Sequence, residues 1–136
     1  MMLMNRMYVL GMMMGILSAI LMIGITPAEA GSLKVIQEQG RAMVRDAEEM
    51  VMHGGMGDGK AILHHCAEVA KQAHAILKVL PSTDEHGKGA APHLQDVMMY
   101  CKRVAELVDQ VNPGASLNLA TKARAAAREA IKDSGA

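Results

Sequence analysis

The feature that most constrains the fold is a set of apolar residues that recurs at intervals of three and four along residues 33–131. This interval places side chains on one face of an α-helix, so each run predicts an amphipathic helix that packs near +20° to its neighbour. There are four such stripes: Ile36, Gly40, Met43, Ala47 and Met50; Ile62, Cys66, Val69, Ala73, Ile76 and Leu80; Leu94, Val97, Cys101, Val104, Val108 and Val111; Leu119, Ala123, Ala126, Ala130 and Ile131. The sequence therefore predicts an all-α fold.

Turn-forming residues set the expected limits of the first two helices. The first should run from about Leu33 to Met52 and stop at the glycine-rich stretch 54–57. Asp58 has the side chain to cap the second helix, which should end at Leu80 before a proline.

The second half has similar punctuation. A polar stretch to Ala91 should connect to a third helix that starts at Pro92 and runs to about Val111. An Asn-Pro-Gly turn at 112–114 precedes Ser116, the expected cap of the fourth helix. Short connections make consecutive helices antiparallel, so residues 31–136 are predicted to form an up-down-up-down four-helix bundle. The two halves also match weakly at an offset of 57 residues, which suggests a duplicated helical hairpin.

The first 30 residues have the pattern of an export signal. Arg6 precedes an uncharged apolar run at 7–25, a Thr-Pro pair breaks the run at 26–27, and Ala-Glu-Ala follows at 28–30. Small residues at the first and third of those last positions are what a signal peptidase reads, so Gly31 should be the first mature residue. The expected location is the periplasm or the exterior of the cell. The run is also long enough to span a bilayer, which leaves an uncleaved anchor as the alternative.

Composition excludes several function classes. The chain has 14 basic and 14 acidic residues, and no basic stripe along any predicted helix. Tyr100 is the only aromatic residue after the leader, so bases cannot stack on the domain and its core must be aliphatic. Nucleic acid is therefore not an expected partner, and neither is a membrane once the leader is removed. We expect a monomer.

Histidine is the residue type that points to a function. Neutral imidazole is the commonest protein ligand for transition-metal ions. All six histidines follow the leader: His53, His64, His65, His74, His86 and His93. Single surface histidines are usually not ligands, and His53 at the end of a helix would also suit the carbonyl end of the helix dipole. His86 is expected in a solvated loop.

Four potential ligands fall at one end of the first predicted hairpin: His53, Asp58, His64 and His65. Two or three nitrogens with one carboxylate suit Cu(II), Ni(II) or Zn(II). Adjacent residues on a helix point about 100° apart, so His64 and His65 cannot easily bind the same ion from a regular helix. Binding through imidazole should weaken as pH falls through about 6.5, the value of free histidine.

The two cysteines occupy buried positions of the second and third stripes. If Leu80 and Leu94 are level, Cys66 and Cys101 lie roughly 10 Å apart along the bundle at 1.5 Å per residue, too far for a bridge. This register favours two free thiols that act as small hydrophobic residues. A disulfide, which is usual in exported chains, and a metal-ligand role for Cys66 are the alternatives.

A resemblance to a known family rests on three short stretches. The turn at 53–57 and the helix at 62–70, with the Thr-Lys stretch at 119–123, resemble the repeated turns and His-bearing helices of the periplasmic small metal-binding protein family. The resemblance implies an exported four-helix bundle that binds copper and other divalent ions through scattered histidines, here His53 and His65. Gln110 and Lys122 stand where that family has histidines.

The expected function is therefore the sequestration or buffering of divalent transition-metal ions outside the cytoplasm, without enzymatic activity. A hydrolytic zinc site needs converging ligands and a positioned base, and this sequence pattern does not indicate that set. The competing hypothesis is a metal-free helical interaction or scaffold domain of the periplasm.

The exported protein should begin at or near Gly31. The intact mass of the protein recovered from the periplasmic fraction measures this directly. Recovery of the full-length chain from the membrane fraction would instead establish the uncleaved anchor.

Overall fold

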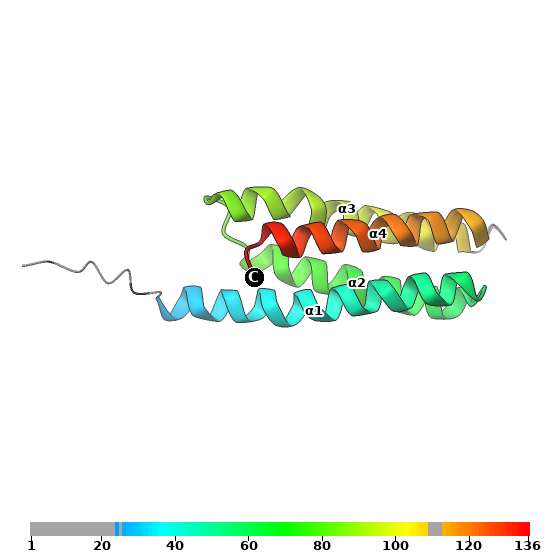
Figure 1. The fold of residues 1–136 in the computed structure, drawn as a ribbon, viewed down its shortest axis with the longest axis horizontal. Coiled ribbons are helices and arrows are strands. Elements are labelled where there is room, and N and C mark those ends of the chain that lie inside the picture. Colours follow the sequence, from blue (N-terminus) through cyan, green and yellow to red (C-terminus); the bar gives the residue numbers. More distant parts are fainter. Residues whose placement is uncertain (1–23, 25, 109–112) are drawn as a thin grey trace, which may run out of the picture.

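The computed structural model describes residues 24, 26–108 and 113–136. Within these residues the chain is helical, with no strand, and forms α1 (Pro27–Gly55), α2 (Gly59–Val79), α3 (Glu85–Val108) and α4 (Pro113–Asp133). Figure 1 shows the four helices side by side along one common direction. The prediction of an all-α chain with four helices is confirmed.

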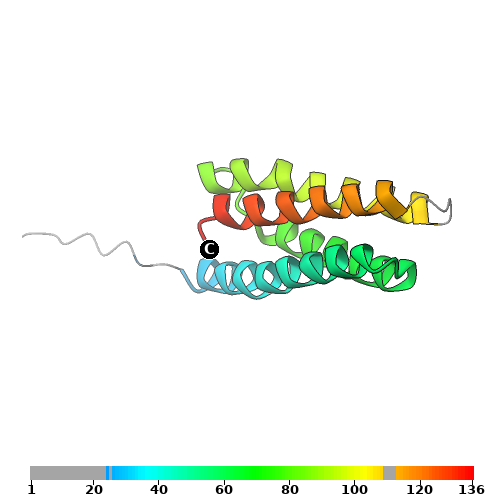
Figure 2. The same cartoon turned by 45° about the vertical axis from the view of Figure 1, so that its right-hand side comes forward.

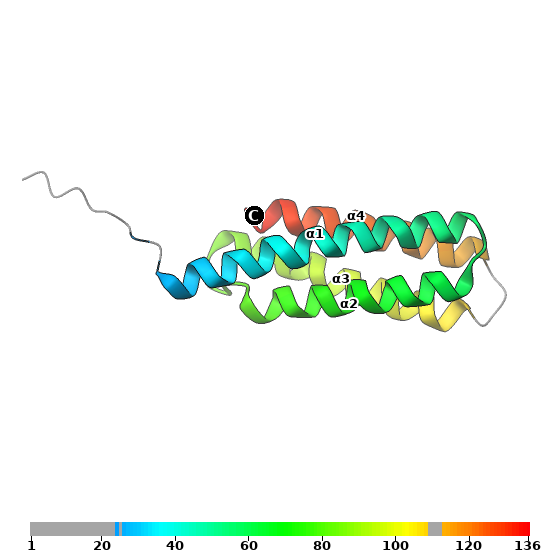
Figure 3. The same ribbon diagram turned by 90° about the horizontal axis from the view of Figure 1, so that it is seen from below.

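Each helix runs opposite to the one before it and packs against two neighbours. The contacts are most extensive within the hairpins α1–α2 and α3–α4, and the two hairpins then pack against each other through α1 with α4 and α2 with α3. Figures 2 and 3 show this pairing from two further directions. The start of α1 and the C-terminus lie at one end of the bundle, and the α1–α2 turn lies at the other.

The core is built from large residues of three helices and small residues of the fourth. Met43 and Met50 of α1, Ile76 of α2 and Leu94 of α3 are fully buried. The buried side of α4 is mostly alanine: Ala120, Ala123, Ala126, Ala127 and Ala130. Burying a side chain of the size of Met or Leu contributes about 1.5–3 kcal/mol, so the first three helices supply most of the apolar stabilisation. The alanines allow α4 to approach closely, because they add little bulk between the helices.

The first helix starts earlier than predicted because its N-terminus carries a capping box. The Glu29 carboxylate accepts a hydrogen bond from the Thr26 backbone at 2.8 Å, and the Thr26 hydroxyl accepts one from the Glu29 backbone at 3.3 Å. Pro27 follows as the first helical residue, where its fixed φ suits a helix. The Thr26 backbone and the Thr26 hydroxyl both donate to the Glu29 carboxylate, and these two hydrogen bonds lower its pKa. The expected start at Leu33 was therefore wrong.

The predicted leader lies mostly outside the described residues. Residues 1–23 and 25 are not described, while the predicted cleavage point after Ala30 falls in the first turns of α1. In the described part of the chain, no helix combines the length and the apolar character that a bilayer span requires.

The third helix also starts earlier than predicted, at Glu85 rather than at Pro92. The Asp84 carboxylate accepts a 2.6 Å hydrogen bond from the Gly87 backbone and caps the helix. His86 is therefore an exposed residue of the first turn, not a loop residue. Pro92 lies inside the helix and leaves the Lys88 carbonyl without a helical donor. Both residues are exposed, so water can supply the missing hydrogen bond.

The fourth helix begins at Pro113, and Ser116 is not its cap. Ser116 lies one turn inside the helix and is only 2% exposed. Proline at the first helical position explains the earlier start. The predicted end of the third helix at Val111 lies outside the described residues.

The early start of α3 shortens its connection to α2 and sets the register of the two cysteines. Both thiols are free and buried, as predicted. The predicted separation of about 10 Å was wrong, because the Cys66 thiol donates a 3.1 Å hydrogen bond to the Cys101 carbonyl. The chain reverses at residues 80–84. Residues that lie equally far before and after this turn along the sequence are therefore level in the hairpin, and Cys66 and Cys101 are nearly such a pair.

Gly87 lies so close to the α2–α3 connection that it leaves no room for a side chain. A Cβ at this position would lie 1.5 Å from the Pro81 carbonyl oxygen, whereas nothing lies within 4 Å of the equivalent position at Gly55. Gly87→Ala should lower the free energy of unfolding by about 1–3 kcal/mol or more, as overpacking does. Gly55→Ala should leave it unchanged or raise it by up to about 1 kcal/mol. Chemical denaturation measures both, and equal midpoints would contradict the close contact at Pro81.

Candidate metal centre

A tight turn between α1 and α2 positions the candidate site. Gly57 adopts φ +75°, a left-handed conformation that suits glycine. The Asp58 backbone donates to the His53 carbonyl at 3.0 Å, and the Asp58 carboxylate accepts from the Ala61 backbone at 3.0 Å. Asp58 therefore caps α2, as predicted. The last turn of α1 consequently lies beside the first two turns of α2.

This turn brings two imidazoles face to face. The rings of His53 on α1 and His65 on α2 stack with centroids 5.3 Å apart and planes 15° apart. Their side chains are 26% and 18% exposed. The Nδ1 atoms of both rings are buried and have no hydrogen-bond partner. Each of these buried nitrogens has a carboxylate as its nearest charged neighbour, Asp58 for His53 and Asp46 for His65.

Carboxylates lie on either side of His53. Glu49, one helical turn before it, places its Oε2 3.9 Å from His53 Nε2. Asp58 places its Oδ2 4.0 Å from His53 Nδ1, while its other oxygen caps α2. The region around His53 is therefore negatively charged, which favours a cation.

His65 faces a different carboxylate across the α1–α2 interface. Asp46 Oδ1 lies 3.4 Å from His65 Nδ1, and Asp46 Oδ2 accepts a 2.6 Å hydrogen bond from the Gln72 amide. Gln72 is only 7% exposed, so this bond is shielded from water and holds the carboxylate in place. A carboxylate beside one ring nitrogen favours a proton there and leaves the other nitrogen free to bind an ion.

Glu49, His53 and His65 form a group of metal-ligating type. One ligand atom of each lies within 4.8 Å of the others. Ligand atoms around a tetrahedral zinc ion with bonds of 2.0–2.1 Å lie about 3.3 Å apart. The three side chains must therefore move closer by small rotations to bind one ion. Their partial exposure leaves room for this movement, so the residues fit a transition-metal ion.

The other predicted ligands are placed less favourably. His64 is exposed and meets only the edge of His65, with centroids 5.3 Å apart and planes at 66°. Asp58 lies near His53 but is not in the group of three. Glu49 was not predicted, although a glutamate four residues before a histidine shares its helix face and could have been found from the sequence. The role of Asp46 depends on contact between two helices.

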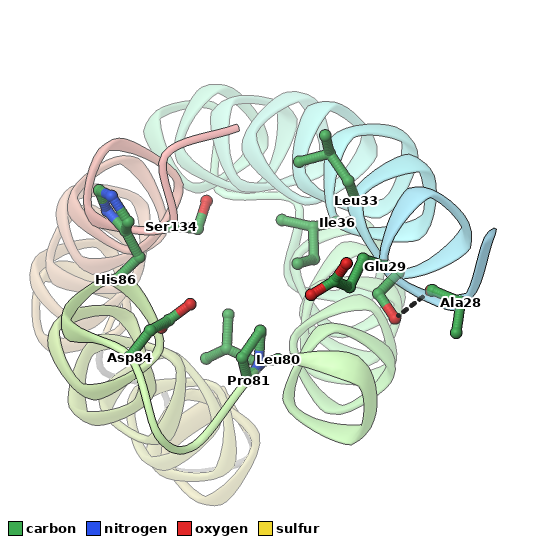
Figure 4. A pocket seen from close by; sticks show the side chains of 10 residues that line it. Ala28, Glu29, Leu33, Ile36, Leu80, Pro81, Asp84, His86 and Ser134 are labelled. Carbon is green, nitrogen blue, oxygen red and sulfur yellow. Dashed lines mark hydrogen bonds between the residues drawn. The ribbon is translucent and has the colours of Figure 1, made fainter. Parts of the chain in front are cut away.

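The opposite end of the bundle, near the start of α1 and the C-terminus, has no comparable group of metal-ligating side chains among the described residues. His86 Nδ1 lies 3.0 Å from the Asp133 carbonyl, and His93 Nε2 lies 3.4 Å from the Asp133 carboxylate. A cavity of about 270 Å³ opens there, viewed along the bundle in Figure 4. Its two carboxylates, Glu29 and Asp84, cap α1 and α3. Among the described residues, neither forms a group of converging ligand atoms with His86.

Comparison of the chain with known protein families, curated proteins and solved structures gave no match. The assignment of a function therefore depends on the geometry and chemistry of the residues themselves.

Glu49 and its neighbour Glu48 provide a matched test of the site. Glu49→Gln should weaken the binding of Zn(II) or Ni(II) by about 10–100-fold or more, because it removes the only anionic ligand of the group. Glu48→Gln should leave affinity unchanged, since Glu48 instead pairs with Arg128 at 2.6 Å. Isothermal titration calorimetry measures both affinities. Equal affinities for the two variants would exclude Glu49 as a ligand.

Proposed function

We propose that this chain is an exported small metal-binding protein that sequesters or buffers divalent transition-metal ions. Glu49, His53 and His65 are its ligands, and the observation that carries the proposal is their convergence within 4.8 Å from two helices. The stacked imidazoles support it, because a carboxylate lies beside Nδ1 of each ring and leaves Nε2 to bind an ion.

The ligand set indicates which ions would bind. Imidazole nitrogens suit Cu(II), Ni(II) and Zn(II), and one carboxylate adds negative charge for a divalent ion. Three protein ligands leave at least one coordination position for water or another ligand, unlike a closed structural site. The Glu49 side chain is 42% exposed, so an ion can enter and leave. These features favour reversible buffering over permanent structural binding, and they require no chemistry on a substrate.

Two further carboxylates support the ligands without joining them. Asp46, held by Gln72, orients the His65 ring. Asp58 lies 4.0 Å from His53 and adds negative charge on the side away from Glu49. Such outer residues commonly raise metal affinity by fixing the tautomer and orientation of ligating histidines.

The sequence supports the cellular location and the family resemblance on which this proposal draws. The predicted leader is the basis for proposing the periplasm or the exterior of the cell, and the turn at 53–57 resembles that of the periplasmic small metal-binding proteins. We further propose that the two hairpins arose by duplication and that metal binding belongs to the first.

A metal-free helical interaction domain is the second candidate. The observation that favours it is the exposure of Met52 and Met56, 51% and 64%, beside the α1–α2 turn. Flexible methionines are common at protein-binding surfaces. In this case His53 would serve only as a partner for nearby carboxylates and the helix dipole.

Titration of purified protein with Zn(II), Ni(II) and Cu(II) distinguishes the two functions. His53→Ala combined with His65→Ala should abolish stoichiometric binding of at least one ion, because two of three ligands are lost. His86→Ala combined with His93→Ala is the matched control at the opposite end and should retain it. The helical circular dichroism of every variant should persist in chelator, since the core does not include these rings. Unchanged binding in the first double variant would refute the proposed site.

A further inference from the structure

A second group of metal-ligating side chains lies between α2 and α3, the adjacent helices seen in Figure 3. Cys66 of α2 and Cys101 of α3 are each 3% exposed, and the Cys66 thiol donates to the Cys101 carbonyl at 3.1 Å. Interaction with the Cys66 thiol, together with burial, raises the pKa of the Cys101 thiol. The two cysteines are thus neighbours across the α2–α3 interface, and both are free.

The two thiols line a cavity of about 240 Å³ that also contains a thioether. Met98, one turn before Cys101, contributes its side chain to the same wall. The rest of the lining is mainly small and apolar: Leu63, Ala67, Ala70, Lys102 and Ala105. Ala67, Lys102 and Ala105 are exposed, so the cavity reaches the surface of the bundle. The cavity therefore has two cysteines and one methionine, all sulfur-containing residues, in a lining that reaches the surface.

The geometry points to a binding site for a soft monovalent metal ion of the copper(I) class, held by Cys66 and Cys101 with Met98 as a third ligand. Thiolate and thioether ligands select Cu(I), whereas the nitrogen and carboxylate ligands of the first site suit divalent ions. This inference goes beyond the proposed buffering of divalent ions and does not depend on it. It makes the protein a carrier of two ion classes at separate places.

The charges of the bound state balance without any change of oxidation state. Each thiol releases its proton to solvent as its sulfur binds the ion, and metal coordination deprotonates a thiol outright. One monovalent cation with two thiolates leaves a single negative charge. Lys102 also lines the cavity, and its long exposed side chain can bring an ammonium group toward this charge.

Anaerobic titration of the reduced full chain with Cu(I), supplied as its acetonitrile complex against a chromophoric chelator, tests this site. Intact mass first verifies that both thiols are free. We expect one Cu(I) per chain, an ultraviolet thiolate-to-copper charge-transfer band, and X-ray absorption fine structure with sulfur as the nearest neighbour. Nitrogen or oxygen neighbours alone would overturn the assignment.

Variants separate this site from the first one. Cys66→Ala with Cys101→Ala keeps the core apolar and should weaken Cu(I) binding at least about 100-fold, since it removes direct ligands where even outer residues contribute 10–100-fold. Met98→Leu should weaken it less, and Met99→Leu, which changes an adjacent exposed methionine outside the cavity, should not. His53→Ala with His65→Ala should retain Cu(I) binding even if it loses divalent ions. Full Cu(I) affinity in a folded double-alanine variant would refute the site, whatever the outcome at His53 and His65.

Discussion

The turn between α1 and α2 is the constraint on which the candidate metal centre depends. Gly57 supplies the left-handed residue that reverses the chain, and Asp58 both closes the turn and caps α2. These local interactions fix how far α2 slides along α1. A shift of one residue on either helix would rotate an imidazole by about 100° and separate His53 from His65. The function that we propose therefore depends on backbone geometry as much as on the ligands themselves.

The bundle combines a rigid interior with adaptable ligands at its surface. Met43, Met50 and Leu94 are fully buried and hold the helices at fixed separations. The ligands of the first site lie at the edge of this core, where His65 is 18% exposed and Glu49 is 42% exposed. Side chains in that position can move by the small distances that coordination requires without disturbing the packing. Such an arrangement suits an ion that binds and leaves.

The two proposed sites differ in chemistry because they draw on different parts of the bundle. The first lies at a helix end, where charged and polar residues remain partly hydrated, and it offers nitrogen and oxygen. The second lies within the α2–α3 interface, where most of the lining is apolar, and it offers the sulfur of Cys66, Cys101 and Met98. If both proposals hold, borderline divalent ions and soft monovalent ions bind at different places in the bundle.

The sequence by itself determined the four helices, their buried faces and the placement of His53 and His65 at one end of the first hairpin. Helical periodicity and the Asp58 cap are local properties, and short stretches of chain express them fully. Tertiary structure decided the pairing of Asp46 with His65 and of Cys66 with Cys101. The starts of α3 and α4 are also determined locally, because Asp84 and Pro113 are recognisable signals of a helix start. The predicted starts were wrong because those signals were not used. The relative height of Cys66 and Cys101 is not a local property. It depends on where the α2–α3 connection turns and on how the two helices pack. Periodicity along one helix does not contain information about how far a second helix is shifted along it.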